Sequence, residues 1–458
     1  MAENSTKKRE TDFTNGPVLG PLVRFMGPIL AALMIQSLYS AVDLMIVGQF
    51  GTAVNVSGVS VGGSLTFAVQ SFITSLAMGT TILLGQYIGE GRRKDASRVV
   101  GTSILLFAGI AVAVTVLLFL FAGSGLSLLQ TPAEAMGEGT VYVRICSVGM
   151  IFIVAYNVMG SIFRGIGDSK TPLIAVGIAC AVNIAGDLLL VGVFHMAAAG
   201  AAIATVVAQG ISVWIAVSIA GKRGLPFDLK WKELHFERAL ALQVFKLGIP
   251  LALQSLVVSG SFLILQGILN SLGLIASAGI GVAGRLVTFI MLFPDAAVQA
   301  LSAFVAHNVG ARRLHRAKKA LLHCIWMNLA FSCLMSILSY FNGTVLTGIF
   351  TSDPAVMVAA AEYLKAYAVD CFLCSFLFSF LGYFNGCGRT TLTMLQGLLG
   401  VVVRITSAFI LKGLSESLFV IGLATPISTV MQNLLCTIYY FATDKTITRQ
   451  YESEELPE

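Results

Sequence analysis

The sequence predicts an all-α integral membrane protein with 12 transmembrane helices in two six-helix lobes, related by a parallel pseudo-two-fold repeat. Three observations predict this fold. The 458 residues are 56% hydrophobic and 11% charged, with a mean hydropathy of +0.86. Long apolar runs recur along the chain, and in lipid such runs satisfy their backbone hydrogen bonds as helices. The second half of the chain also repeats the pattern of the first.

Each predicted helix is a hydrophobic segment with about the 20 residues that a bilayer requires, or more. Twelve such segments can be marked, separated by short stretches rich in glycine, proline or charge. In chain order they are 21–49, 56–86, 98–122, 135–163, 172–194, 199–221, 241–270, 276–308, 318–346, 354–384, 391–412 and 416–442.

The lysines and arginines gather in the even-numbered connections, whereas the odd-numbered connections are nearly free of them, Lys412 being the exception. Cytoplasmic loops of membrane proteins carry this excess of Lys and Arg. We therefore expect a multi-pass protein of the inner (cytoplasmic) membrane with both termini in the cytoplasm. The cations are Arg92, Arg93, Lys94 and Arg98; Arg164 and Lys170; those of Lys222–Arg238; Arg312, Arg313, Arg316, Lys318 and Lys319; and Arg389.

A nearly constant offset in the numbering superimposes the two halves, so that Pro28 falls on Pro250 and Tyr142 on Tyr363. Six helices are an even number, so both halves have the same orientation. Parallel halves related by an axis along the membrane normal are typical of transporters. The predicted domains are a cytoplasmic tail at 1–20, an N-lobe at 21–221, a cytoplasmic linker at 222–240, a C-lobe at 241–442 and a cytoplasmic tail at 443–458.

Composition disfavours several other classes of protein. The net charge of +6 lies mainly in loops, which indicates topology and not nucleic-acid binding. The polar N-terminus lacks the apolar core and cleavage site of a signal peptide. The eight cysteines indicate no disulfide framework, and no His, Cys or Ser is paired with a base as an enzyme requires. We therefore expect neither an enzyme nor a cofactor, and no metal other than a coupling Na⁺.

The first helix holds one charge, Asp43, within the stretch from Phe25 to Phe50. A carboxylate at membrane depth costs about 2.5–3.5 kcal/mol even on the insertion scale, which makes Asp43 a candidate functional residue. Gln36 and Ser40 precede it by seven and three residues and share its helix face. Pro28 removes a backbone donor near the cytoplasmic end of this helix.

A second acid lies on the fifth helix, where Asn183 and Asp187 are four residues apart and share a face. The hairpin to the sixth helix turns near residue 196, nine residues after Asp187 and nine before Thr205, so these two lie at one depth. Asp43 lies at a similar distance from the outer end of its own helix. This convergence of oxygen atoms suits a small cation or a proton. The alternative is that these residues only join helices by hydrogen bonds.

The repeat is chemically asymmetric, which predicts different roles for the two lobes. An ion pair between Arg404 and Asp370 and a substrate role for these residues both remain open. In the C-lobe Leu265, Arg404, Ala408 and Pro426 stand opposite Asp43, Asn183, Asp187 and Thr205, while Arg285, Asp295 and Asp370 stand opposite Ser64, Thr74 and Gly149. The candidate cavity and substrate residues are Gln36, Tyr39, Asn157, Gln254, Gln266, Arg285, Asp295 and Asp370.

The stretch Tyr39-Ser-Ala-Val-Asp43-x-x-x-Val47-Gly48 and the turn at 163–172, together with the twelve-helix repeat, resemble the multidrug and toxic compound extrusion (MATE) family over residues 20–442. The resemblance implies a cation site at Asp43, Asn183, Asp187 and Thr205. It also implies export of organic, often cationic, compounds in exchange for Na⁺ or H⁺. Many members carry a Glu in the seventh helix, where this chain has Gln254 and no acid. Asp370 matches an acid of the tenth helix in one branch.

We therefore expect a cation-coupled multidrug efflux antiporter that works by alternating access. The expected partners are small drug-like molecules and the lipid bilayer, with no nucleic acid, and the expected functional unit is a monomer. A flippase for lipid-linked oligosaccharide remains an alternative because Arg285 and Arg404 offer cations for phosphate groups. A channel fits less well, because the acid cluster of one lobe resembles a closed cation site.

Overall fold

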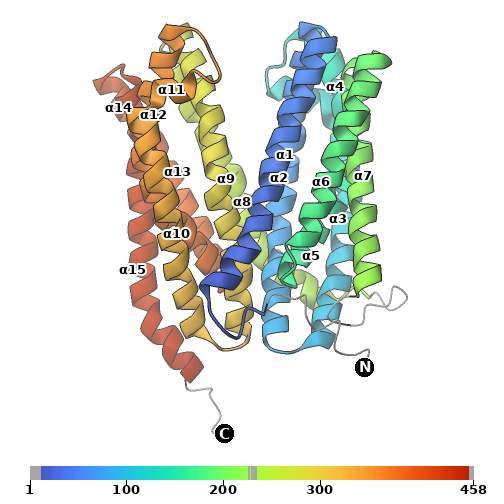
Figure 1. Cartoon of the computed structure of the whole chain (residues 1–458), viewed down its shortest axis with the longest axis vertical. Helices are drawn as coiled ribbons and strands as arrows, with labels where there is room; N and C mark the ends of the chain where they lie inside the picture. Colours follow the sequence, from blue (N-terminus) through green and yellow to red (C-terminus); the bar gives the residue numbers. More distant parts are fainter. Residues whose placement is uncertain (1–11, 225–226, 228–234, 453–458) are drawn as a thin grey trace. The chain divides into compact units, whose positions relative to one another are not determined.

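The computed structural model describes residues 12–224, 227 and 235–452, and within these residues every regular element is a helix (Figure 1). In chain order the elements are α1 (Leu19–Phe50), α2 (Ala53–Gly89), α3 (Arg93–Leu128), α4 (Ala133–Val148), α5 (Met150–Gly165), α6 (Lys170–Asp187), the π-helix η1 (Leu188–Val193), α7 (Ala197–Arg223), α8 (Arg238–Asn270), α9 (Leu274–Gly310), α10 (Leu314–Phe341), α11 (Gly343–Thr347), α12 (Pro354–Gly386), α13 (Thr390–Leu414), α14 (Leu418–Gly422) and α15 (Ala424–Glu452).

Eleven helical spans within the described residues are long and apolar enough to cross a membrane. The pair α4 and α5 passes the same criterion together, although the two helices meet at 55°. The prediction of an all-α membrane protein is therefore confirmed, with twelve spans when this bent pair counts as one. Each of the twelve hydrophobic segments marked in the sequence falls on one of these spans.

The bend between α4 and α5 lies at Gly149, inside the segment 135–163 that the sequence predicted without a break. A Cβ atom at Gly149 would stand only 2.2 Å from a methyl group of Val206 on α7. Glycine is therefore required here, because α7 packs directly against the backbone at the bend. This requirement comes from a tertiary contact, which a hydrophobicity pattern does not contain.

The chain divides into two compact units, of which unit 1 holds Asp12 and Arg24–Ala252 among the described residues. In this unit α2 packs against α3, α4 and α5, and α6 packs against α7. Its core has two apolar clusters, one around Ile73, Leu84, Phe107 and Ile153 and another around Val47, Leu126 and Tyr142.

Unit 2 holds Phe13–Val23 and the described residues from Leu253 onward. Here α12 packs against α9, α10 and α15, and α13 packs against α15. Figure 1 shows the short helices α11 and α14 at the same end of this bundle. One apolar cluster joins α8, α13 and α14 through Leu265, Ala408 and Ile421.

The segment Phe13–Val23, which we call the N-terminal anchor, packs within unit 2. Phe13 is 1% exposed and its ring lies 5.1 Å from that of Phe304. Its carbonyl oxygen accepts hydrogen bonds from Asn308 (3.1 Å) and Arg316 (3.0 Å). The start of α1 is thus fixed to the turn between α9 and α10 by buried hydrogen bonds.

The first half of α8, up to Ala252, packs in unit 1. A Cβ atom at Gly248 would stand 2.2 Å from the carbonyl oxygen of Leu76, and one at Gly79 would stand 2.4 Å from that of Val244. The backbones of α2 and α8 therefore touch at these glycines. The compact units differ in this respect from the predicted lobes 21–221 and 241–442.

The predicted linker 222–240 and tails 1–20 and 443–458 lie partly outside the described residues. The described end of the linker is bound to α3, because Arg98 forms an ion pair of 2.5 Å with Glu237 and Thr102 donates to the carbonyl oxygen of His235.

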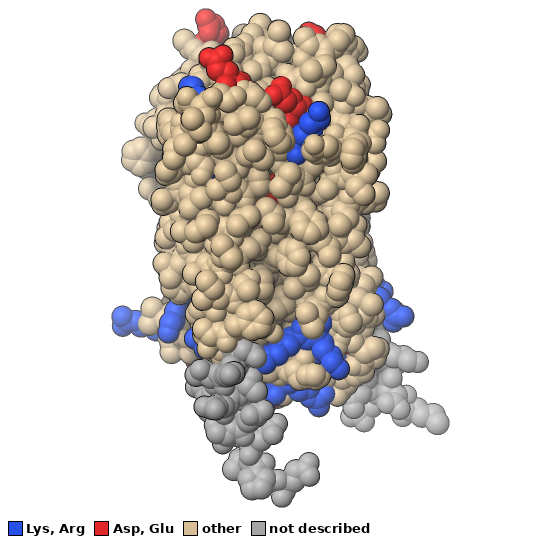
Figure 2. Space-filling view, turned by 90° about the vertical axis from the view of Figure 1, so that its left-hand side faces the viewer, with Lys and Arg blue, Asp and Glu red and all other residues tan. Residues whose placement is uncertain are grey.

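Charge on the surface separates along the helix direction. On the face shown in Figure 2, lysines and arginines gather near one end, most acidic residues lie near the other, and the wide band between them is almost uncharged. Such a band is what the hydrocarbon core of a bilayer requires.

Candidate functional site

Two carboxylates meet inside unit 1. Asp43 on α1 is 9% exposed and Asp187 at the end of α6 is 0% exposed. Their carboxyl groups lie close enough for their charges to interact. Among the described residues, no side-chain or backbone donor bonds to Asp187 Oδ1 or Oδ2, or to Asp43 Oδ1. Two such groups in a medium of low dielectric constant cannot both keep their charge cheaply, so the pair favours a shared proton or a bound cation.

Asp187 stands where the helix changes its winding. It is the last residue of α6, and the next six residues, Leu188–Val193, form the π-helix η1. Short π-helical turns occur frequently at functional sites. The sequence reasoning did not predict η1, and the apolar run 188–193 contains no signal that distinguishes a π-helix from an α-helix.

Asn183 and Thr205 adjoin the acid pair from α6 and α7. The amide of Asn183 donates to the hydroxyl of Thr205 at 3.4 Å, and its Oδ1 atom has no hydrogen-bond partner among the described residues. Since Asn183 precedes Asp187 by one helical turn, the structure brings together all four residues of the predicted cation site. Their roles in binding remain a prediction.

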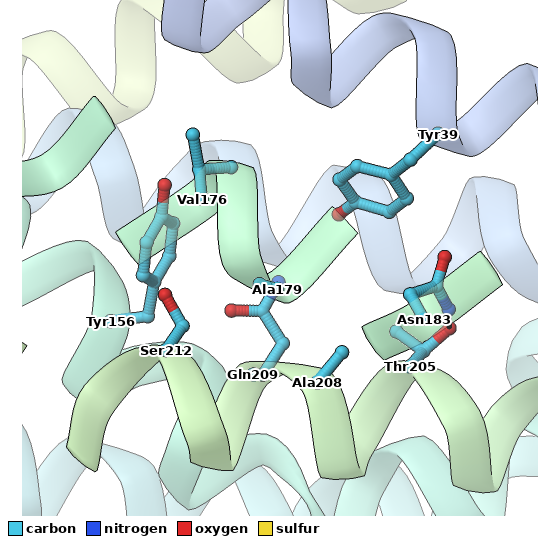
Figure 3. A pocket seen from close by; sticks show the side chains of 9 residues that line it. All are labelled: Tyr39, Tyr156, Val176, Ala179, Asn183, Thr205, Ala208, Gln209 and Ser212. Atoms are coloured by element: carbon cyan, nitrogen blue, oxygen red, sulfur yellow. Dashed lines mark hydrogen bonds between the residues drawn. The ribbon is translucent and has the colours of Figure 1, made fainter. Parts of the chain in front are cut away.

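A small pocket opens beside these residues between α6 and α7, with Tyr39 pointing toward it from α1 (Figure 3). Its volume is about 10 Å³, close to the 10–15 Å³ that a single water molecule needs. The pocket is therefore matched to water or a small ion and is too small for a drug-sized compound. It is lined by Tyr39, Tyr156, Val176, Ala179, Asn183, Thr205, Ala208, Gln209 and Ser212.

Three polar residues of this pocket were missed by the sequence reasoning, namely Tyr156, Gln209 and Ser212. Gln209 is 6% exposed and Ser212 0%, and neither Gln209 Oε1 nor Ser212 Oγ has a hydrogen-bond partner among the described residues. A signal for two of them exists: Gln209 and Ser212 follow Thr205 by four and seven residues, which places all three on one face of α7.

The arrangement offers hard oxygen donors only: two carboxylates, an amide oxygen and a hydroxyl. Carboxylate and carbonyl oxygens suit hard cations, and a pair of close acids also suits a proton. Within the described residues, no group of three or more His, Cys, Asp or Glu side chains forms a site for a transition metal.

Other predicted residues of the N-lobe lie elsewhere in unit 1. Asn157 is 7% exposed; it accepts from Thr74 (2.7 Å) and donates to the carbonyl oxygen of Ile153 (2.8 Å). Its amide therefore joins α2 to α5. Ser40 is exposed and donates to the carbonyl oxygen of Gln36 at 3.0 Å, so its hydroxyl binds its own helix. Gln36 is half-buried and does not line the pocket.

Four predicted residues of the C-lobe are distributed over unit 2. Arg285 on α9 and Gln266 on α8 are exposed, and Gln254 on α8 is half-buried. Asp295 on α9 is also exposed. Within the described part of unit 2, these four side chains share no hydrogen bond or ion pair with one another.

Arg404 and Asp370, considered as an ion pair, form no direct salt bridge among the described side chains. Asp370 accepts hydrogen bonds from Thr429 at 2.6 Å and from Cys374 at 3.5 Å. Arg404 instead donates to Ser261 at 2.6 Å and lies 4.0 Å from the ring centre of Phe262. Arg404 and Asp370 therefore each have polar partners of their own, which sequence spacing alone did not reveal.

Comparison with known proteins agrees with this architecture. The MatE family model matches residues 28–189 and again residues 250–410. The two matches therefore begin at Pro28 and Pro250, the same two prolines that the internal repeat superimposes.

Two relatives and one solved structure are similar over nearly the whole chain. The probable multidrug resistance protein YpnP of Bacillus subtilis is 28% identical over 94% of this chain and 96% of its own. The multidrug export protein MepA of Staphylococcus saprophyticus is 22% identical over 88% and 89%. The solved structure, an outward-facing multidrug resistance MATE family transporter of the MOP superfamily, has a TM-score of 0.89 at 19% identity and covers 96% of this chain and 99% of its own.

Proposed function

Because this chain belongs to the MATE family of membrane transporters, we propose that it exports organic, drug-like compounds in exchange for Na⁺ or H⁺. It is a multidrug efflux transporter of the multi-pass membrane class and not an enzyme. The relatives named as multidrug resistance and multidrug export proteins support drug-like substrates.

The main support for the proposal is the buried pair of Asp43 and Asp187. Most of the carboxyl oxygens of this pair accept no hydrogen bond from the described residues. In the empty state the two carboxylates repel one another. Uptake of a proton or Na⁺ removes this repulsion, and the site then becomes compact. We assign Asn183 and Thr205 to the same site, because their oxygens adjoin the acids.

Antiport requires that ion and substrate weaken one another's binding. Neutralising the acids allows α1 to shift against α6 and α7, since Pro28 lies inside α1 and removes one of its backbone hydrogen bonds. A shift of α1 alters the surface available to the substrate. By linkage, the factor by which the ion lowers substrate affinity equals the factor by which substrate lowers ion affinity.

Asp43→Asn tests this mechanism because it mimics the neutral, ion-occupied state. Purified variant and parent are titrated with ethidium as a cationic probe, at high and low Na⁺ and at pH 5.5 and 8. We expect the parent's affinity to fall by about tenfold or more when the ion is present, a coupling of roughly 1.4 kcal/mol. The variant is expected to bind weakly under every condition. The mechanism would be contradicted if the ion changed the variant's affinity for ethidium as it changes the parent's.

Transport itself is measured in proteoliposomes with independently imposed Na⁺ and pH gradients. One of the two gradients is expected to drive ethidium movement in the parent, and neither is expected to do so in Asp43→Asn or Asp187→Asn. Movement at the parent's rate without any gradient would instead favour a channel.

The flippase alternative receives less support from the structure. A phosphate-binding cavity needs accessible cations, and Arg404 is only 5% exposed and already bonded to Ser261. Arg285 alone remains exposed among the two cations considered. We further propose a location in the cytoplasmic membrane with both termini in the cytoplasm, and a monomer as the functional unit.

A further inference from the structure

The repeat allows each position of unit 2 to be compared with its counterpart in unit 1. Leu265 and Ala408 are the counterparts of Asp43 and Asp187 under the offset that superimposes the two halves of the sequence. Both belong to one apolar cluster of unit 2, just as Asp43 and Asp187 meet in unit 1. The counterparts of the two acids therefore also lie in one cluster, but both are apolar and no acid stands at either position.

A cation stands at this equivalent site instead. Arg404 is the counterpart of Asn183, and Ser261, to which it donates at 2.6 Å, is the counterpart of Tyr39. Asn183 and Tyr39 line the same pocket in unit 1. Unit 2 therefore has the guanidinium side chain of Arg404 at the repeat position where unit 1 has the amide side chain of Asn183 in its candidate cation site.

An acid that unit 1 lacks accompanies this cation. Asp370 is the counterpart of Gly149, where unit 1 has its helix break and no room for a side chain. In unit 2 the helix α12 continues through this position. Asp370 is 3% exposed and accepts a hydrogen bond from Thr429, the counterpart of Ala208 in the wall of the pocket.

Hydrogen bonds from α15 to α13 and to α12 place Arg404 and Asp370 near the same segment of α15. Ser428 donates to the carbonyl oxygen of Gly400, one turn before Arg404, and the next residue, Thr429, donates to Asp370. The charges of Asp370 and Arg404 attract one another although no direct hydrogen bond joins them. Water screens this attraction little, because Arg404 is 5% and Asp370 3% exposed.

We propose that Arg404 is a fixed counter-ion for Asp370 and replaces, in unit 2, the mobile cation that unit 1 binds. The acid pair of unit 1 lacks a cationic partner and must take one from solution, whereas the acid of unit 2 has one attached to the chain. Only unit 1 therefore responds to the coupling ion. This inference rests on the proposed function of the Asp43–Asp187 pair.

The test asks whether removing Arg404 creates a cation site at Asp370. Asp43→Asn/Asp187→Asn serves as background, so that unit 1 no longer responds. Thermal unfolding of the purified protein is measured in NaCl and in choline chloride, each at pH 5.5 and 8. The groups facing Asp370 are Cys374 from its own helix, Thr429 and Arg404; Tyr363 and Tyr367 of α12 also interact with its charge.

In the background alone we expect no change of midpoint between the salts or the two pH values. Adding Arg404→Gln is expected to produce a rise of about 3 °C or more with Na⁺ or with acid, because a bound cation stabilises the folded state. Further addition of Asp370→Asn is expected to remove this rise. Arg404→Lys, which keeps the charge, and Arg285→Gln, which removes an exposed cation of the same unit, are expected to produce none.

An absent rise with Arg404→Gln, or a rise that survives Asp370→Asn, overturns the proposal. Should Arg404→Gln fail to fold, recovery of folded protein by the added Asp370→Asn supports the counter-ion, and no recovery overturns it. Failure of the proposed function has a different signature: the background variant would keep the parent's response to Na⁺ or acid.

Discussion

At the scale of single residues, the site of unit 1 brings together several buried oxygens that accept no hydrogen bond from the described residues. Asp187, Asn183, Gln209 and Ser212 each contribute at least one such buried atom. Native proteins satisfy most buried polar atoms, so a group of exceptions in one place indicates bound water or an ion. Asn157 is the contrasting case, because its amide oxygen accepts from Thr74 of α2 and its amide nitrogen donates to Ile153 of its own helix.

The pocket beyond the acids predicts a role for Gln209. Gln209→Leu keeps the size of the side chain but removes the buried oxygen, so water or an ion in the pocket loses one ligand. We expect the concentration of Na⁺ or H⁺ needed for half-maximal transport to rise by about tenfold, which is the size of effect expected when one hydrogen bond to a charged group is lost. Ethidium transport in proteoliposomes measures this change.

The matched control is Gln243→Leu, at an exposed position of α8 in the same unit. It is expected to leave the ion dependence as in the parent. Equal ion dependence in Gln209→Leu and the parent would show that the pocket takes no part in ion binding.

At the scale of helices, close backbone approaches determine where several elements lie. Gly149 allows α7 to pack against the bend between α4 and α5, and Gly248 allows the first half of α8 to touch α2. Small residues are the usual means by which membrane helices approach closely, because lipid offers little hydrophobic driving force for their association.

Gly248→Val is therefore expected to destabilise unit 1. The added side chain would place a carbon 2.2 Å from the carbonyl oxygen of Leu76, so one of the two helices must move. Overpacking of this kind costs about 1–3 kcal/mol, which corresponds to a fall of roughly 2–10 °C in the midpoint of thermal unfolding. Unfolding of the detergent-solubilised protein, followed by size-exclusion chromatography after heating, measures it.

Gly260→Val on the same helix is the control, since a Cβ atom there meets nothing within 4 Å. Its midpoint is expected to stay near that of the parent. The close approach of α2 and α8 would be contradicted by equal midpoints for the two variants.

At the scale of the whole molecule, charge predicts how the chain is inserted. The chain around Arg93, at the start of α3, and around Lys319, in the first turns of α10, is rich in cations, whereas the connection around Ser352 has none. Cytoplasmic loops attract the cations, so the first two positions are expected in the cytoplasm and the third outside.

Single cysteines at these three exposed positions test the topology in a variant that lacks the eight native cysteines. In intact cells a membrane-impermeant maleimide is expected to label Ser352→Cys but not Arg93→Cys or Lys319→Cys. In inverted vesicles the pattern is expected to reverse. Labelling of Arg93→Cys from outside would break the assignment of both termini to the cytoplasm.

The sequence by itself determined the membrane class, the twelve segments, the internal repeat and the candidate group of Asp43, Asn183, Asp187 and Thr205. Those features follow from patterns along one chain: apolar runs long enough for a bilayer, a nearly constant offset between the two halves, and equal distances from a hairpin. Depth in a membrane is a one-dimensional quantity, so Asp187 and Thr205 could be placed at one level without knowing how their helices pack.

Tertiary structure alone decided what each side chain bonds to. Val206 of another helix lies directly against Gly149 at the bend, and the π-helix η1 follows α6 in an apolar run that carries no signal for it. Arg404 and Asp370 form no direct salt bridge and instead make separate hydrogen bonds to Ser261 and Thr429. Hydrogen-bond partners depend on distances and directions in three dimensions, because several helices compete for each buried group, and sequence spacing does not contain this information.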